Sequence, residues 1–422
     1  MSHNSYQKTQ LENGLKIISE TIDYARSICV GIWVNAGSRD EKKEENGISH
    51  FIEHMSFKGT KNRTAIQIAK ELDAIGGMSN AFTGKENTCF HAKVLGKHFS
   101  VAADVLSDIF LNSVYSPEDI EKERWIILQE IKMQEDSPEE YIHDLFQRVF
   151  WKDHPIGMPI LGTKESVMGI NREKIIRYIN THYSPKNVII SAAGAVSHDD
   201  VLKYFLPMFE QIPASDIDPK RFPPSPCFDV SVNYKDLEQV HICLGTESVS
   251  IKDQRRFAVS VLNSILGGNM SSRLFQEIRE KQGLAYSVYS FIGSYSDTGF
   301  LGIYVACDAR HVNDVLLTIN KEIKRLFHAD IEQSDVDSAK EYLTGGIYLS
   351  SESIENRMIR IARNELIFGR YIPYEETVAN IEKVSLDDVV NVAEMLFKDK
   401  QLALVTLGPI KENELDLSLL SF

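Results

Sequence analysis

The chain has 422 residues, of which 43% are hydrophobic, so it is long enough to build two or more buried cores. Its net charge is −14 and it contains no basic cluster with interleaved aromatic residues, so no nucleic-acid partner is expected. No apolar run reaches about 18 residues, and the polar N-terminal stretch lacks the apolar core of a signal peptide. The five cysteines are widely spaced and form no CxxC pair, which is typical of reduced, buried cysteines. We therefore expect a cytoplasmic protein with no membrane contact.

The first half of the chain combines short strands with amphipathic helices. In chain order, we predict strands within 15–21 and 27–37, helices at 46–57, 64–75, 97–111 and 116–135, a strand pair near 80–95 and a helix–turn–strand unit at 175–196. The second half repeats this order. It has strands within 229–236 and 239–247, helices at 253–266, 270–282 and 309–327, a strand pair at 285–307 and a helix–turn–strand unit at 389–410.

A proline-rich stretch separates the two halves. Residues 211–228 hold five of the thirteen prolines, which is typical of an extended linker. We therefore predict an α+β protein with two homologous domains, each a mostly antiparallel β-sheet with helices packed on one face. The expected limits are 1–210 for the first domain, 211–228 for the linker and 229–422 for the second domain.

The sequence "HFIEH" at 50–54 is the strongest chemical signal in the chain. Each residue of an α-helix turns by about 100°, so His50, Glu53 and His54 project from one face. The two imidazoles can share one zinc ion, while the carboxylate sits beside it without having to bind it. A surface helix that happens to carry two histidines is the alternative. A catalytic zinc typically takes three protein ligands, so a third residue is required.

The segment "SPEDIEKERWIILQEIKMQE" at 116–135 offers two candidates for the third ligand. Ser116 can cap this helix and Pro117 suits its first position. Glu123 and Glu130 are seven residues apart and therefore lie on nearly the same face of the helix. One carboxylate could bind the metal while the other supports the site, although glutamates on a charged helix often simply face water.

These motifs resemble the pitrilysin/insulinase family of zinc metallopeptidases, whose inverted motif is HxxEH. The likeness is strongest to the bacterial branch that is similar to mitochondrial processing peptidases, and it covers essentially the whole chain. The matching stretches are "GISHFIEHMSFKGT", "GGMSNAFTGKENTCF", "ERWIILQEI", "HPIGMPILG", "YSPKNVIISAAGAV" and "LGGNMSSRLFQEIREKQGLAYSV".

The resemblance implies one Zn²⁺ per chain, bound by His50, His54 and Glu130. It assigns the general base to Glu53, which would take a proton from the attacking water and pass it to the leaving amine. Glu123 matches an additional acidic position that the family carries on the same helix.

The resemblance also implies substrate-contacting residues in both halves. Asn80 and Ala81 match the strand that lines the bound peptide, which suggests that an extended substrate adds to a sheet edge. Arg279 and Tyr286 match the family's Arg/Tyr pair, with Phe275 as its apolar neighbour. Either polar side chain could stabilise the oxyanion that forms during peptide cleavage.

We therefore expect a zinc-dependent endopeptidase that acts on short or unfolded peptides. The alternatives are a processing peptidase that removes N-terminal extensions and a non-catalytic scaffold, against which the intact HxxEH and Glu130 argue. In larger relatives the zinc site and the Arg/Tyr pair lie at opposite ends of a four-domain chain. This chain has two domains and carries both elements, so we expect a homodimer in which each chain completes the other's active site.

Overall fold

The computed structural model describes residues 5–214, 220–327, 330–398 and 402–420. The chain forms two compact units, and each unit consists of three segments. The first unit comprises Met1–Lys132, Met158–Arg221 and Leu349–Ile372, and the second comprises Met133–Gly157, Phe222–Tyr348 and Pro373–Phe422. One crossing between units, at residues 221 and 222, falls within the expected linker 211–228. Residues 215–219 of that linker lie outside the described residues, and the remainder contains neither helix nor strand.

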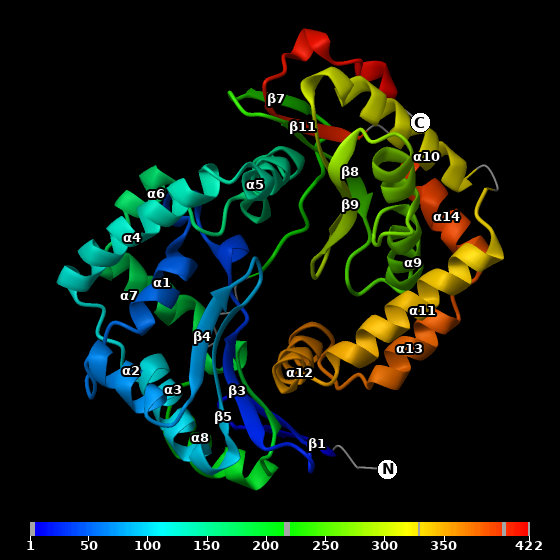
Figure 1. Ribbon diagram of the computed structural model, residues 1–422. Helices are drawn as coiled ribbons and strands as arrows, with labels where there is room; N and C mark the ends of the chain where they lie inside the picture. The colour runs from blue at the N-terminus through cyan, green and yellow to red at the C-terminus, as the bar shows by residue number, and fades with distance from the viewer. Residues whose placement is uncertain (1–4, 215–219, 328–329, 399–401, 421–422) are drawn as a thin grey trace. The chain divides into compact units, whose positions relative to one another are not determined.

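The first unit contains a six-stranded sheet with the order β1-β2-β6-β3-β5-β4 (Figure 1). Its strands are β1 (Ser5–Gln10), β2 (Lys16–Thr21), β3 (Ser27–Val34), β4 (Met78–Thr83), β5 (Thr88–Leu95) and β6 (Val188–Gly194). All neighbouring strands are antiparallel except β2 and β6, which are parallel. Strand β4 is an edge of this sheet.

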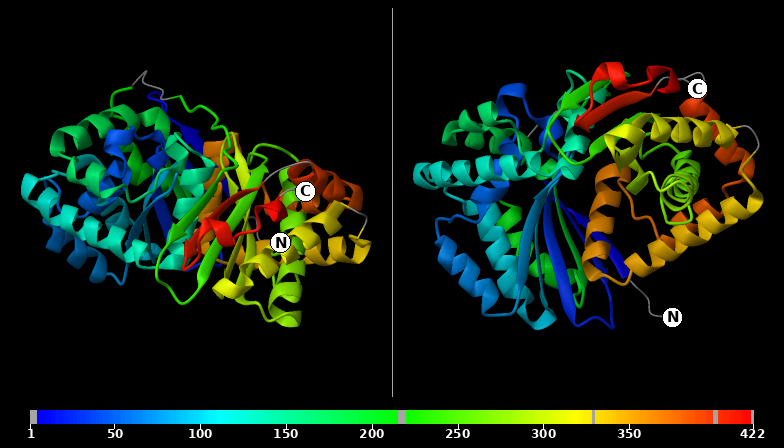
Figure 2. Two further views of the ribbon diagram at one scale, coloured as in Figure 1. Left: turned by 90° about the horizontal axis from the view of Figure 1, so that it is seen from above. Right: turned by 45° about the horizontal axis from the view of Figure 1, so that its top comes forward.

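Helices cover both faces of the first sheet, whereas the sequence predicted helices on one face only. On one face, α3 (Phe99–Asn112) and α8 (His198–Phe209) bury apolar side chains against β3, β5 and β6. On the opposite face, α12 (Ile354–Phe368) packs against Cys29 and Trp33 of β3 (Figure 2). A Cβ atom at Gly31 would lie only 2.9 Å from the sulfur of Met358, so glycine permits the close approach of α12. Because both faces of β3 are buried, its sequence is an almost continuous apolar run.

The second unit repeats this topology with five strands in the order β7-β11-β8-β10-β9. Its strands are β7 (Val230–Tyr234), β8 (Val240–Ser248), β9 (Ala285–Ser294), β10 (Gly299–Cys307) and β11 (Ala403–Gly408). The only parallel pair among these described strands is β7 with β11, which corresponds to β2 with β6 in the first unit. The predicted internal repeat and the predicted α+β fold class are therefore confirmed.

Each sheet also receives one helix from the other half of the sequence. Helices α9 (Arg256–Leu266), α10 (Val312–Phe327) and α14 (Leu386–Phe397) cover one face of the second sheet, and α5 (Pro138–Phe150) covers the other. Helix α5 precedes the linker but belongs to the second unit, whereas α12 follows the linker but belongs to the first. The compact units therefore differ from the expected domain limits 1–210 and 229–422 by these exchanged helices.

Seven further α-helices are present in the described part of the chain, and two of them carry the candidate site. They are α1 (Ile48–Ser56), α2 (Ala65–Asp73), α4 (Pro117–Glu135), α6 (Lys164–Met168), α7 (Arg172–His182), α11 (Gln333–Ser350) and α13 (Tyr374–Glu382), with a π-helical segment at Phe275–Lys281. Across the described part of the chain, no helix combines the length and apolarity needed to span a membrane.

Candidate metal centre

Helix α1 presents the HxxEH motif because its opposite face is buried. The apolar side chains of this face recur at helical spacing and pack against α4 and α7. They are Ile48, Phe51, Ile52 and Met55. His50, Glu53 and His54 consequently project from the other side of α1, as the sequence predicted.

The start of α1 is fixed by a buried carboxylate that lies outside the helix. Glu41 accepts hydrogen bonds from the backbone N–H groups of Gly47, at 2.7 Å, and Ser49, at 2.8 Å. Burial raises the pKa of Glu41 to about 7, although these hydrogen bonds act in the opposite direction. Gly47 adopts a φ of +91°, and a Cβ atom there would lie 2.6 Å from the carbonyl oxygen of Leu161. The motif helix therefore begins at a defined point.

Helix α4 supplies the acidic residues. Ser116 caps it by accepting a hydrogen bond from the backbone N–H of Asp119 at 3.1 Å, which confirms the predicted cap. Ile120 and Ile127 are buried against α1 and set the rotation of α4. This packing directs both Glu123 and Glu130 toward the motif helix.

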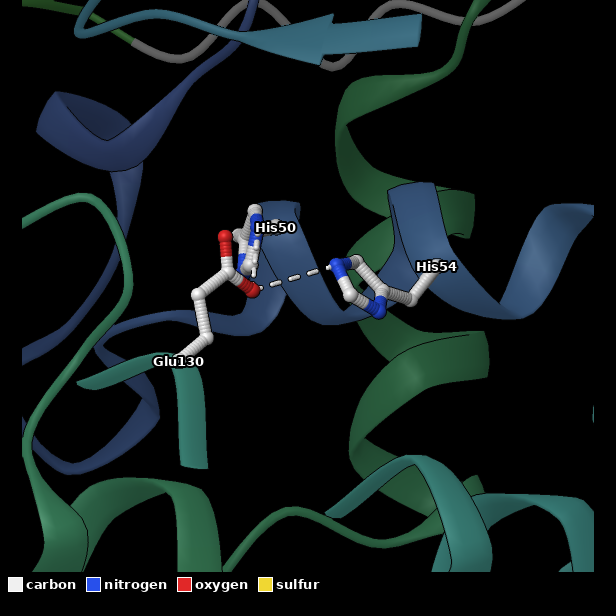
Figure 3. Close-up of side chains that lie close together, drawn as sticks. All are labelled: His50, His54 and Glu130. Atoms are coloured by element: carbon white, nitrogen blue, oxygen red, sulfur yellow. Dashed lines mark ion pairs between the residues drawn. The ribbon is translucent and has the colours of Figure 1, made fainter. Parts of the chain in front are cut away.

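Three side chains converge between α1 and α4 (Figure 3). One potential ligand atom from each of His50, His54 and Glu130 lies within 4.8 Å of the others, and no other such group of three occurs among the described residues. The Oε2 atom of Glu130 lies 3.7 Å from Nε2 of His50 and 3.5 Å from Nε2 of His54. Two imidazole nitrogens and one carboxylate oxygen are a common ligand set of catalytic zinc, so these residues fit that ion.

The second nitrogen of His54 is held by a buried acidic residue. Glu123, whose side chain is only 4% exposed, accepts a hydrogen bond at Oε2 from Nδ1 of His54 at 3.2 Å. Its Oε1 atom lies 2.7 Å from Nζ of Lys58. A carboxylate at Nδ1 fixes the tautomer that leaves Nε2 free to bind a metal. The sequence analysis missed Lys58, and its position four residues after His54, just beyond the end of the motif helix, was the available signal.

The environments of His50 and Glu130 favour the protonation states that metal binding requires, whereas the environment of His54 favours its protonated form. Burial is the main reason why the pKa of His50 is lowered to about 4, and the neighbouring His54 adds to this effect. The hydrogen bond from His54 lowers the pKa of Glu130. For His54 itself, burial lowers the pKa, but Glu130 and Glu123 together outweigh burial and raise it. A neutral His50 and an ionised Glu130 can bind a cation without first losing a proton.

Glu53 lies beside the three converging residues and is not one of them. Its Oε2 accepts a hydrogen bond of 2.6 Å from the hydroxyl group of Thr83 on β4. Burial raises the pKa of Glu53, while the hydrogen bond from Thr83 and the charge of His54 oppose the rise. Thr83 is a second residue that the sequence analysis did not identify, because only the sheet brings it to α1.

The first-unit residues expected to contact substrate lie on the edge strand β4. The side chain of Asn80 is exposed, whereas Ala81 is buried. The side-chain oxygen of Asn80 accepts a hydrogen bond from the N–H of Ala81 at 2.9 Å. These two residues therefore occupy the strand at which an extended peptide could add to the sheet.

The second-unit residues implied by the resemblance also form a cluster. The guanidinium carbon of Arg279 lies 4.7 Å from the ring centre of Phe275 and 4.3 Å from that of Tyr286. Arg279 and Phe275 belong to the π-helical segment, a feature that is frequent at functional sites. Tyr286 is 75% exposed, which is unusual for a tyrosine at the start of a strand and suits contact with a ligand.

Together the fold and the site define a two-domain α+β protein with an inverted zinc-peptidase motif. Residues 16–164 match the family described as "Insulinase (Peptidase family M16)", and residues 169–343 match the "Peptidase M16 inactive domain". The chain belongs to peptidase family M16. The first match contains the HxxEH motif and Glu130, whereas the second contains no HxxEH sequence.

Relatives along the whole chain agree with this assignment. An uncharacterized zinc protease of Bacillus subtilis is 39% identical over 399 residues, covering 94% of this chain and 97% of the relative. Another from Streptomyces coelicolor is 38% identical over 417 residues, covering 97% and 90% of the two chains. These names support a zinc metallopeptidase.

Solved structures show the same fold. The crystal structure of a protease from Helicobacter pylori has a TM-score of 0.89 at 22% identity and covers 96% of this chain and 100% of its own. The structure of a peptidase M16 inactive domain from Pseudomonas fluorescens also has a TM-score of 0.89, at 18% identity, and covers 96% and 98% of the two chains. These structures confirm the predicted fold, and the family matches and relatives above confirm the predicted family.

Proposed function

We propose that this chain is a zinc-dependent endopeptidase that hydrolyses short or unfolded peptides. The observation that carries the proposal is the convergence of His50, His54 and Glu130, with the carboxylate of Glu53 held beside them. These three residues would hold one Zn²⁺ per chain, which supplies Lewis acidity toward the scissile carbonyl and lowers the pKa of a water.

The remaining steps fall to the side chains of the protein. Glu53 accepts a proton from the attacking water and transfers it to the leaving amine, a role that its raised pKa suits. Glu123 orients His54 through Nδ1, and Lys58 compensates the buried charge of Glu123. We assign oxyanion stabilisation to the exposed hydroxyl group of Tyr286 or to the guanidinium group of Arg279.

The proposed substrate is an extended peptide that adds to the edge of β4. Strand addition uses backbone hydrogen bonds and requires a segment free of its own secondary structure. Asn80 and Ala81 would therefore contact the peptide backbone and accept many sequences. Such an edge distinguishes an unfolded segment from a folded one, but it does not distinguish one sequence from another.

Removal of metal tests the proposed function directly. Treatment with a chelator is expected to reduce hydrolysis of a generic quenched peptide to background, and one equivalent of Zn²⁺ per chain is expected to restore it, because the chemistry needs a Lewis acid. A His54→Ala variant processed in parallel should bind less zinc and remain inactive. A protein that purifies without stoichiometric zinc and cleaves no peptide would instead be a scaffold.

We also propose that two copies of the chain share their active sites. The metal-binding residues belong to the first compact unit, whereas Arg279 and Tyr286 belong to the second. In a twofold symmetric dimer, each chain's Arg279 and Tyr286 would serve its partner's zinc, giving two composite sites.

Subunit mixing is expected to reveal this sharing. His54→Ala and Arg279→Ala should each be nearly inactive alone, because each lacks one element of every site. After equal mixing under exchanging conditions, half of the dimers are mixed and each has one intact site, so activity should reach about a quarter of the wild-type value. A monomer in sedimentation, or no rescue despite demonstrated exchange, would contradict the shared-site proposal.

A further inference from the structure

The direction of Thr83 follows from its place on strand β4. Side chains along a strand alternate between the two faces of the sheet. Ala81 is buried in the core beneath α3 and α8, whereas the ring of Phe82 faces the other side, 5.4 Å from the ring of Trp33. Thr83 therefore points to the same side as Ala81, where its hydroxyl group reaches Oε2 of Glu53 on α1 at 2.6 Å.

The backbone around Thr83 is fixed by its neighbours. Thr83 pairs with Thr88 of β5, and the hairpin between them closes with a hydrogen bond from the N–H of Gly84 to the carbonyl oxygen of Asn87 at 2.8 Å. Two further backbone bonds tie this hairpin to the segment that precedes α1. They are Ser38 N–H to the Gly84 carbonyl at 3.1 Å and Arg39 N–H to the Lys85 carbonyl at 2.8 Å. The hydroxyl group is thus presented from a rigid support.

We propose that Thr83 is a positioning residue that orients the carboxylate of Glu53 for proton transfer. The inference rests on the proposed function, because it requires Glu53 to be the general base. A glutamate carboxylate rotates almost freely about its last torsion, so a single strong hydrogen bond removes much of that freedom. The bond from Thr83 engages Oε2, and within the described part of the chain no hydrogen bond engages Oε1, which is the oxygen left to accept the proton.

The same hairpin carries both the proposed peptide contacts and the support for the base. Asn80 and Ala81 lie on β4 three and two residues before Thr83, respectively. A peptide that adds to β4 would be placed against the rigid element that also fixes Glu53. Loss of the Thr83 hydroxyl group should therefore disturb proton transfer while leaving the strand edge, and with it peptide binding, intact.

Kinetics of Thr83→Val and Thr83→Ser test the proposal. Valine keeps the shape of threonine but cannot donate, so kcat should fall by about 10- to 100-fold, the scale of one hydrogen bond to a charged group. KM and zinc content should stay within about twofold of wild type. Serine keeps the donor, so Thr83→Ser should recover most of the lost kcat.

A matched control lies directly across the hairpin. Thr88 donates its hydroxyl group to the carbonyl oxygen of Ala36 at 2.9 Å, and not to Glu53. Thr88→Val removes the same kind of donor from the same hairpin and should leave kcat unchanged in the folded protein. An equal fall of kcat in both valine variants would overturn the proposal.

Glu53→Gln separates failure of this inference from failure of the proposed function. If Glu53→Gln remains active, Glu53 is not the base and the function itself is wrong. If Glu53→Gln is inactive while Thr83→Val retains full kcat, only the role of Thr83 is overturned. In the Glu53→Gln background, adding Thr83→Val should leave binding of an uncleaved peptide unchanged, and weaker binding would place Thr83 in substrate docking instead.

Discussion

Replacement of Glu53 by glutamine is expected to leave zinc bound and to lower peptide hydrolysis by about 10²- to 10⁴-fold, the typical contribution of a general base. The amide group cannot accept a proton from water, but its oxygen can still accept the hydrogen bond that Thr83 donates. Glu53 is not one of the three residues whose ligand atoms converge, so its replacement by glutamine should leave zinc affinity largely unchanged. The measurements are zinc content after purification and kcat/KM on a quenched peptide.

Glu118→Gln is a suitable control because it makes the same chemical change at an exposed position on α4. The side chain of Glu118 is 79% exposed, and among the described residues its ion pair is with Lys122, four residues further along the same helix. Its replacement should alter neither zinc content nor activity. Loss of zinc in Glu53→Gln would assign Glu53 to the metal ligands, and retained activity would remove it from the mechanism.

Replacement of Glu130 by alanine is expected to weaken zinc binding by at least about 10²-fold, because it removes one of three ligands. Its Oε2 atom is the acceptor that both Nε2 atoms approach, at 3.7 and 3.5 Å. Zinc affinity can be measured by competition with a chromogenic chelator, a readout that does not depend on catalysis. Equal affinities of the wild type and Glu130→Ala would remove Glu130 from the site.

Glu123→Ala provides the comparison on the same helix. Glu123 contacts His54 at Nδ1, the nitrogen that points away from the converging atoms, so its loss should lower activity more than zinc affinity. Replacement of such a supporting residue typically costs about 10- to 100-fold. If the two alanine variants showed the reverse order of zinc affinities, the assignment of ligand and supporting residue would have to be exchanged.

The sequence by itself determined the motif helix and the repeat. The HxxEH spacing places His50, Glu53 and His54 on one face of the helix whatever the helix packs against. The reason is that the rotation per residue around the helix axis is a local property of the backbone. The order of strands and helices in the two halves likewise predicted two similar sheets, since strand and helix periods are also local. The family resemblance of the sequence also assigned Glu130 to the metal.

Residue spacing alone left the roles of the two α4 carboxylates open, and only the tertiary structure supplies the physical reason for their division and shows which residues support the site. Glu123 and Glu130 lie on one face of the helix and are locally equivalent, and the packing of Ile120 and Ile127 against α1 brings Glu130 to the Nε2 atoms and Glu123 to Nδ1. The exchange of α5 and α12 between the units is also invisible in the sequence. An amphipathic helix specifies that it must bury an apolar face, but its sequence does not say which sheet will cover that face, because the hydrophobic effect has no directional preference.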